Sequence, residues 1–154
     1  MESEATEPGR GEKGEVQEKG VDLHRLRTVA AQLARETGLR LIVLFGSAVR
    51  DEARPPEDVD LGLLGNSAID AVAVTNRLIE MLGEQRVDVA DLGHADALLL
   101  MLVAREGVPL YEGQPGEFAR FCSLAARRYA DTRKFRAAEH EELRAFVARH
   151  ARGR

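Results

Sequence analysis

The chain has 154 residues, of which 44% are apolar and 31% charged, and its formal net charge is −4. This length suits one domain with a hydrophobic core, and the composition is that of a soluble globular protein. The net charge gives no general signal for nucleic-acid binding, and every apolar run is far shorter than the roughly 20 residues of a membrane span. A single cysteine, Cys122, excludes an internal disulfide and fits a reducing cytoplasm.

The two ends of the chain differ in charge. Residues 1–20 carry six Glu, three basic residues and four Gly, so we predict a disordered acidic tail that buries too little apolar surface to fold. Residues 114–154 carry ten Arg and Lys against five Asp and Glu, which reverses the sign of the rest of the chain. This basic helical extension suggests a partner surface or an RNA contact, and a solvated helix face is the alternative.

Between the two ends, hydrophobic periodicity predicts that helices and strands alternate. The expected elements, in chain order, are a helix over 21–38, a buried strand over 39–45, a loop over 50–57, a strand over 58–64, a helix over 66–83, a strand over 85–92, a helix over 95–107, an extended piece over 108–113 and a helical stretch over 117–152 with at most one break. This order predicts a small α/β (α+β) domain.

Three aspartates form the first candidate site. Asp58 and Asp60 are two residues apart on one strand, so their side chains project from the same face. Carboxylates that close repel each other unless a cation lies between them. Asp88 completes a cluster of three if its strand lies beside the first. Without Cys or His nearby, such a cluster is a hard oxygen site, which favours Mg²⁺ and its phosphate ligands over zinc.

The second candidate is the turn that follows the buried strand over 39–45. A strand that ends at Gly46-Ser47 exposes backbone N–H groups and a hydroxyl, which is typical of an anion-binding nest. Arg50 and Arg54 are close enough in sequence to add charge-assisted contacts to phosphates. Each feature alone is common in other contexts. The missing Gly-Lys-Ser/Thr excludes a P-loop, and Ile69 disfavours an EF-hand because it stands at the twelfth loop position.

Taken together, these residues form a known pattern: Gly46-Ser47, ten residues, then Asp58-Val59-Asp60. With this GSx10DxD signature, and with the stretches ARPPEDVDLGLL, RVDVADL and LVAREGVPLYEG, the sequence resembles the minimal nucleotidyltransferases (MNT) of the DNA polymerase β superfamily over roughly residues 23–136. It is most similar to the antitoxin half of HEPN–MNT toxin–antitoxin pairs. The resemblance implies the minimal nucleotidyltransferase fold, a small mixed sheet flanked by helices, over residues 21–113.

The resemblance also implies roles for individual residues. Gly46 and Ser47, with Arg50 beside them, would bind the triphosphate of ATP. The implied catalytic residues are also the ligands of two Mg²⁺ ions, and they are three carboxylates: Asp58, Asp60 and Asp88. The implied reaction transfers AMP from MgATP to a tyrosine of the cognate HEPN ribonuclease toxin, which would block RNA cleavage. The implied protein is a cytoplasmic enzyme that forms a hetero-oligomer with the toxin, without direct contact to nucleic acid or membrane.

Two positions depart from the family pattern, Glu57 where Ser is common and Asp51 where Gly is frequent. Neither is a motif residue, so the enzyme interpretation is kept. His94 is expected to cap the helix that follows it, with a general base or a phosphate contact as the alternative. Two other functions stay open: an antitoxin that acts by binding alone, and a small-molecule nucleotidyltransferase. The latter is disfavoured because only about forty residues follow Tyr111, few for a substrate domain.

Overall fold

The structure is a computed structural model that describes residues 21–50, 58–83 and 86–151. The predicted tail over 1–20 and the loop residues Asp51, Arg54 and Glu57 lie outside these ranges. The elements, in chain order, are α1 (Leu23–Thr37), β1 (Leu39–Phe45), α2 (Ser47–Arg50), β2 (Asp58–Gly65), α3 (Ala71–Leu82), β3 (Arg86–Asp91), α4 (Ala97–Glu106), β4 (Val108–Glu112), α5 (Glu117–Asp131) and α6 (Arg133–Ala151).

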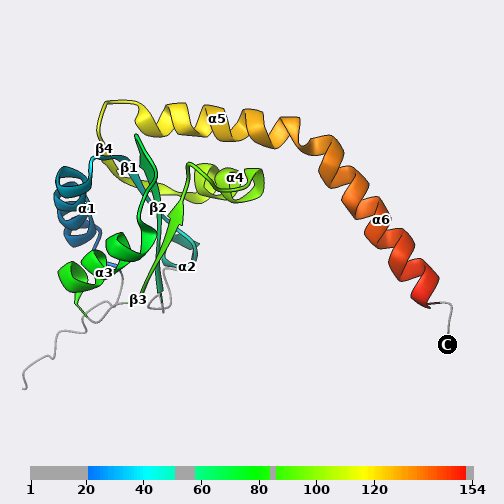
Figure 1. The fold of residues 1–154 in the computed structure, drawn as a ribbon, viewed down its shortest axis with the longest axis horizontal. Helices are drawn as coiled ribbons and strands as arrows, with labels where there is room; N and C mark the ends of the chain where they lie inside the picture. The colour runs from blue at the N-terminus through cyan, green and yellow to red at the C-terminus, as the bar shows by residue number, and fades with distance from the viewer. Residues whose placement is uncertain (1–20, 51–57, 84–85, 152–154) are drawn as a thin grey trace, which may run out of the picture.

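The described strands form one mixed sheet of order β3-β2-β1-β4, with helices on both faces (Figure 1). β1 pairs antiparallel with β2 and with β4, whereas β2 and β3 run parallel. The expectation of a small mixed sheet flanked by helices is therefore confirmed. The parallel pair matters most for the site because it sets β2 and β3 side by side in the same direction.

The buried strand β1 lies inside the sheet, which explains why it is apolar on both faces. Ile42 and Leu44 belong to the core that α1 and α3 cover. Leu41 and Val43 belong to a second core, which α4 and α5 cover on the opposite face. Side chains alternate between the faces of a strand, so a strand with helices on both sides needs an apolar residue at nearly every position.

Aspartate caps fix the starts of three helices, and two of these starts differ in detail from expectation. Asp22 begins α1 by accepting a hydrogen bond from the backbone N–H of Arg25 at 3.0 Å. α3 begins at Ala71, later than expected, because Asp70 is its cap. The helix after His94 is capped by Asp96, so the expectation that His94 is the cap is wrong. An aspartate one residue before the helix binds its free N–H groups better than a more distant imidazole.

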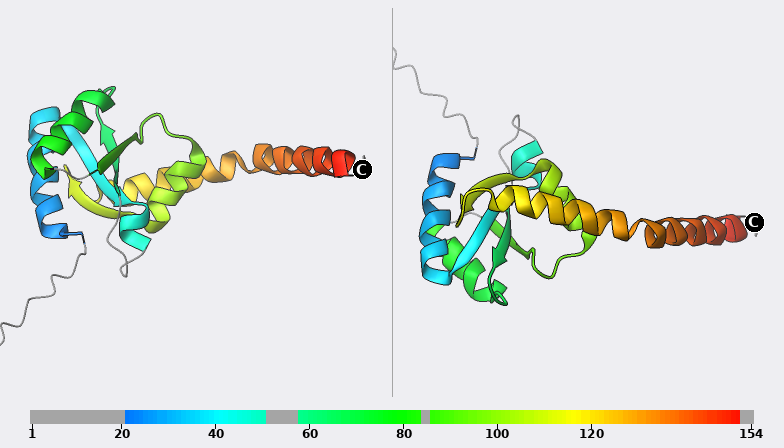
Figure 2. Two further views of the ribbon diagram at one scale, coloured as in Figure 1. Left: turned by 90° about the horizontal axis from the view of Figure 1, so that it is seen from below. Right: turned by 90° about the horizontal axis from the view of Figure 1, so that it is seen from above.

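The C-terminal extension is helical and breaks once, at Thr132. α5 is part of the body of the protein because it buries Phe121 and Ala125 against α4 and the sheet. At its first turn, Glu117 is buried and forms an ion pair with Arg40 at 3.3 Å. α6, in contrast, projects away from the sheet and its other helices (Figures 1 and 2). Among the described helices, none is long and apolar enough to span a lipid bilayer.

This difference between α5 and α6 predicts where the chain can be shortened. A chain that ends at Thr132 is expected to keep its unfolding temperature within about 2 °C, because α6 adds little to the core. A chain that ends at Gly116 also loses Phe121, whose burial alone is worth roughly 3–5 kcal/mol, and is expected to unfold at a much lower temperature. Calorimetric unfolding of the two shortened chains beside the full chain checks this. A large loss of stability in the first chain would contradict it.

Candidate active site

The sheet brings the three predicted aspartates to one place. Asp60 lies opposite Phe45 of β1 on one side and opposite Asp88 of β3 on the other. Residues paired in register on adjacent strands point to the same face, so the carboxylates of Asp60 and Asp88 project together. Asp58 lies two residues earlier on the same face of β2. The parallel pairing on which this cluster depended is thus present in the structure.

The aspartates occupy the face of the sheet that α4 and α5 cover, just beyond the end of that cover. The next residue of β2 on this face is Gly62, where an added Cβ would lie 2.9 Å from Cδ1 of Leu92. Leu92 is buried and belongs to the α4–α5 core, so the apolar cover ends at this point. Asp58 and Asp60 are half-buried and Asp88 is exposed. The site is therefore a shallow polar region beside a dry core.

Gly46 brings the backbone of the predicted phosphate turn against Asp60. Its φ is +76°, a left-handed conformation that favours glycine. A Cβ at this position would lie 2.0 Å from Oδ2 of Asp60 and 2.9 Å from its Cγ. Only a residue without a side chain lets the turn and the carboxylate approach each other this closely.

The turn continues directly into the short helix α2. The backbone N–H groups of Val49 and Arg50 donate to the carbonyl of Gly46, at 3.2 and 3.3 Å. Ser47 is exposed at the start of α2, where its hydroxyl is accessible to a ligand. Arg50 returns to the same turn, because its Nε donates to the Gly46 carbonyl at 3.4 Å. The predicted phosphate-binding residues therefore lie against Asp60, and Asp58 and Asp88 lie on the same face of the sheet.

The surroundings of Asp60 oppose the ionisation of its carboxyl. Burial raises the pKa of its carboxyl above the ordinary value, and the negative charges of Asp88 and Asp58 raise it further. The cation of Arg50 acts in the opposite direction on the same pKa. An acid whose ionisation is opposed by burial and by two neighbouring acids is a characteristic setting for a bound cation or a catalytic function.

The donor set suits Mg²⁺, although the protein alone does not complete its coordination. Within the described ranges, no three acidic, His or Cys side chains converge closely enough to enclose an ion. Mg²⁺ characteristically takes only one or two carboxylates and fills its remaining positions with water and substrate phosphates. Oxygen donors at Asp58, Asp60 and Asp88, open to solvent and next to a phosphate-type turn, fit that requirement.

One residue of the site escaped the sequence analysis. Glu106, the last residue of α4, lies with its Oε2 3.4 Å from Nε of Arg50. Its only signal in the sequence is the Glu-Gly pair before the strand β4. Asp91 and His94 are separate from the site. Asp91 lies at the opposite end of β3, where it accepts a hydrogen bond from the Gly93 N–H and pairs with the His94 ring at 2.8 Å. His94 is therefore paired with Asp91, away from the turn where a general base or a phosphate contact would have to lie.

A mixed sheet that sets acids from parallel strands against a glycine-serine turn defines a nucleotidyltransferase domain. The polymerase β-type nucleotidyltransferase family model matches residues 27–115. The chain belongs to this family, and the resemblance seen in the GSx10DxD signature is confirmed.

The individual proteins that the chain resembles share about a quarter of its residues. The chain is 24% identical over 147 residues to the protein adenylyltransferase MntA of Aphanizomenon flos-aquae, a match that covers 87% of this chain and 98% of the relative. Among solved structures, a toxin–antitoxin crystal structure with AMP-PNP superimposes with a TM-score of 0.67 at 24% identity, over 76% of this chain and 97% of that one. The MNT antitoxin complexed with tri-AMPylated HEPN toxin from Shewanella oneidensis gives 0.65 at 23% identity, over 79% and 98% of the two chains. These structures share the fold.

The contact between Gly46 and Asp60 predicts the effect of a single methyl group. Gly46→Ala is expected to displace the Asp60 carboxylate and to lower nucleotidyl transfer by roughly 100-fold, because small misplacements of reacting groups have effects of this size. Gly38→Ala is the matched control, since Gly38 has a φ of +71° but nothing within 4 Å of an added Cβ. Both variants lose about 1 kcal/mol of stability from the backbone conformation, and only the first should lose transfer. Equal transfer rates in the two would contradict this account.

The raised pKa of Asp60 predicts a gain of stability when its charge is removed. The folded state binds this proton more tightly than the unfolded chain, so ionised Asp60 disfavours folding at pH values above its ordinary pKa. In the absence of Mg²⁺, Asp60→Asn is expected to raise the unfolding temperature at pH 7 by roughly 2 °C. The gain should shrink as the pH falls from the raised pKa of folded Asp60 toward the ordinary pKa of the unfolded chain, and it should vanish below that value. Glu139→Gln, an exposed acid on α6, is the control; a lower unfolding temperature for Asp60→Asn would contradict the prediction.

Proposed function

We propose that this protein is an antitoxin nucleotidyltransferase, which neutralises a cognate HEPN ribonuclease toxin by transferring AMP from MgATP to a tyrosine of the toxin. One observation carries the proposal: Asp60 lies beside Asp88 in the sheet and against the backbone of Gly46. The relative that aligns over most of the chain is a protein adenylyltransferase, and similar folds occur in toxin–antitoxin structures with AMP-PNP or with an AMPylated HEPN toxin. The protein would act in the cytoplasm.

The residues of the chain divide the reaction between them. The backbone of the Gly46-Ser47 turn and the Ser47 hydroxyl would bind the triphosphate, with Arg50 beside them as a charged donor. Asp58, Asp60 and Asp88 would hold two Mg²⁺ ions, which neutralise the phosphate charge and the leaving pyrophosphate when bound. Asp88 would accept the proton of the attacking tyrosine hydroxyl, a role supported by its exposure to solvent.

The toxin tyrosine attacks the α-phosphate of ATP and forms a new oxygen–phosphorus bond to AMP. The bond between the α-phosphate and the bridging oxygen breaks at the same centre, and pyrophosphate leaves. A shallow, open site suits an acceptor on another protein, because a tyrosine on a large surface reaches Asp88 only if nothing covers it. The half-buried pair Asp58 and Asp60 lies deeper, where the nucleotide would bind first.

Neutralisation by binding alone is the second candidate, and the electrostatics of the site argue against it. A pure binding protein gains nothing from a partly buried acid with two further acids beside it, where burial and then the charges of Asp88 and Asp58 oppose the ionisation of Asp60 by raising its pKa. A small-molecule transferase is a weaker candidate, because the relative that aligns over most of the chain is a protein adenylyltransferase. The projecting α6, exposed at Phe135 and Leu143, is the part we assign to the toxin contact.

The proposal predicts transfer of label from ATP to the toxin. Protein purified with the toxin partner from its own cells is mixed with Mg²⁺ and ATP labelled at the α-phosphate. A labelled band of the size of the toxin is expected, and Asp58→Asn is expected to reduce it by roughly 100-fold or more. Removing Mg²⁺ with a chelator should have the same effect.

Asp91→Asn is the matched control, because Asp91 is an aspartate of the same sheet at the opposite end of β3 and should leave the label unchanged. If the partner co-purifies and no label moves, the binding interpretation replaces the catalytic one. If an extract of the same cells is added and label appears on one of its small molecules instead of on a protein, the small-molecule interpretation replaces the catalytic one.

A further inference from the structure

Arg50 is held at its Nε by two groups, and one of them belongs to Glu106, a residue distant in the sequence. Nε lies 3.4 Å from the Gly46 carbonyl and 3.4 Å from Oε2 of Glu106. A guanidinium has donors at Nε and at both Nη atoms, so a contact at Nε leaves the Nη donors free for a second ligand. The Arg50 side chain remains 57% exposed, which leaves this other edge accessible.

The position of Glu106 follows from the packing of α4 against β1. An added Cβ on Gly107 would lie 2.3 Å from the Val103 carbonyl oxygen and 2.5 Å from Cγ1 of Val43. Only glycine therefore lets the end of α4 approach β1 this closely. Val108, the first residue of β4, pairs with Leu44, so the residues before Val108 run beside the end of β1 and the Gly46 turn.

The Glu106 side chain is 30% exposed, but the oxygen that faces Arg50 is buried. Oε2 of Glu106 is inaccessible to solvent and has no hydrogen-bond partner among the described residues, and the guanidinium of Arg50 is the cation beside it. A buried carboxylate oxygen without a compensating charge is strongly unfavourable. If Arg50 moved away to bind a phosphate, Glu106 would lose the cation beside its carboxylate. Arg50 is therefore expected to bind from where it lies.

From these contacts we infer that Glu106 is a positioning residue for the nucleotide: it holds Nε of Arg50 at the Gly46 turn so that the Nη groups face the triphosphate. The inference rests on the proposed function, because it assumes that a nucleoside triphosphate binds at this turn. Glu106 itself touches neither the nucleotide nor the acceptor. Its carboxylate acts through Arg50, and its effect should therefore disappear when Arg50 is removed.

A double-mutant cycle on nucleotide binding tests this dependence. The binding of AMP-PNP with Mg²⁺ is measured by titration calorimetry for the full chain and for Glu106→Gln, Glu106→Ala, Arg50→Ala and the double alanine variant. Each Glu106 variant is expected to weaken binding by roughly ten-fold, the size of one charge-assisted hydrogen bond. In the Arg50→Ala background, Glu106→Ala is expected to add no further loss.

A purely structural role for Glu106 would give a different result. Glu36→Ala is the control for general loss of stability, because it breaks the ion pair between α1 and α3 at 2.8 Å (Glu36 with Arg77) and should leave AMP-PNP binding unchanged. Glu106→Gln keeps the volume of the side chain, so it separates loss of charge from loss of folding. Thermal unfolding of every variant is recorded beside the binding.

Three results would overturn the inference. Unchanged binding in both Glu106 variants would show that the ion pair serves stability alone. An equal loss with and without Arg50 would show that Glu106 acts by another route. Tighter binding after removal of Glu106 would show that it competes with the nucleotide for Arg50. If the unaltered chain binds no AMP-PNP, the proposed function itself fails, and that result is distinguishable from the other three.

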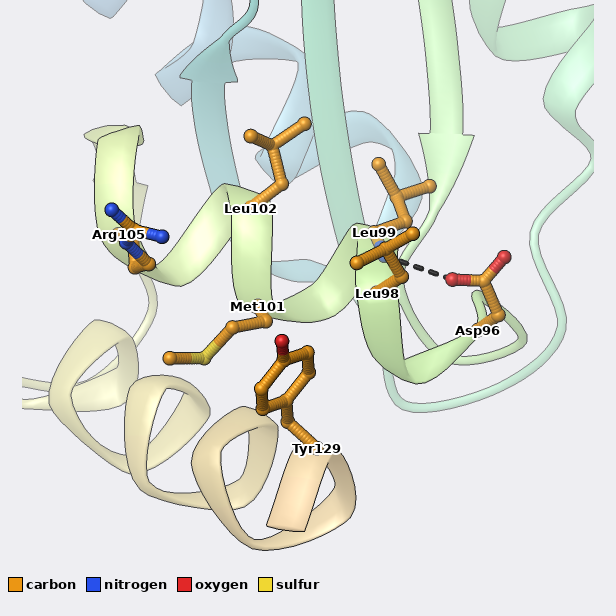
Figure 3. A pocket seen from close by; sticks show the side chains of 7 residues that line it. All are labelled: Asp96, Leu98, Leu99, Met101, Leu102, Arg105 and Tyr129. Carbon is orange, nitrogen blue, oxygen red and sulfur yellow. Dashed lines mark hydrogen bonds between the residues drawn. The ribbon is translucent and has the colours of Figure 1, made fainter. Parts of the chain in front are cut away.

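A second feature of the fold lies between α4 and α5. A groove of about 440 Å³ between α4 and α5 is lined mainly by apolar side chains, with Asp96 and Arg105 also at its wall (Figure 3). Tyr129 points from α5 toward α4 and lies beside Met101. Nothing in the described part of the chain identifies what would cover this groove.

Discussion

The close approach of the Gly46 backbone to the Asp60 carboxylate is the constraint on which the rest of the site depends. It requires a residue without a side chain at the end of β1 and an acid at the facing position of β2, in one register. A shift of the pairing by one residue would turn Asp60 to the opposite face and bring Leu61 to the turn. The buried residues of β1 prevent that shift, because each has its place in one of the two cores.

The same arrangement opposes stability at the site. Burial and the negative charges of Asp88 and Asp58 raise the pKa of Asp60, and the apolar core ends at Gly62 and Leu92, directly beside these acids. The fold offsets this cost elsewhere: Leu33, Ile42 and Leu63 are fully buried on the opposite face. Enzymes commonly place charges that repel one another where a bound ligand will compensate them. A rigid sheet keeps these side chains in position until the ligand binds. The proposed chemistry requires both parts: an apolar core that holds the sheet rigid, and a group of acids at its edge that a cation can compensate.

Much of this could be predicted from the sequence because its signals are local. The alternation of Asp58, Val59, Asp60 and Leu61 gives the strand and its wet face, and Gly46 after an apolar run gives the turn. The pairing of β2 with β3, which brings Asp88 to Asp60, is not a local signal; it was supported only by the resemblance to a family. Glu106 was missed for the same reason, since 55 or more residues of chain separate it from the turn that it contacts.

Helix boundaries show the limit of local signals in a different way. Ser67 and Asp70 both suit the start of α3, and packing against the core decides between them: Val74, Leu78 and Leu82 are the buried residues of this helix. Asp70 caps it one residue before Ala71, where the apolar stripe is already in phase with the sheet. At α4 the same competition between His94 and Asp96 is decided by Asp91, which takes the imidazole and leaves the cap to Asp96. A cap residue is thus selected by where the helix must lie and by what its competitors already bind, and both are properties of the folded chain.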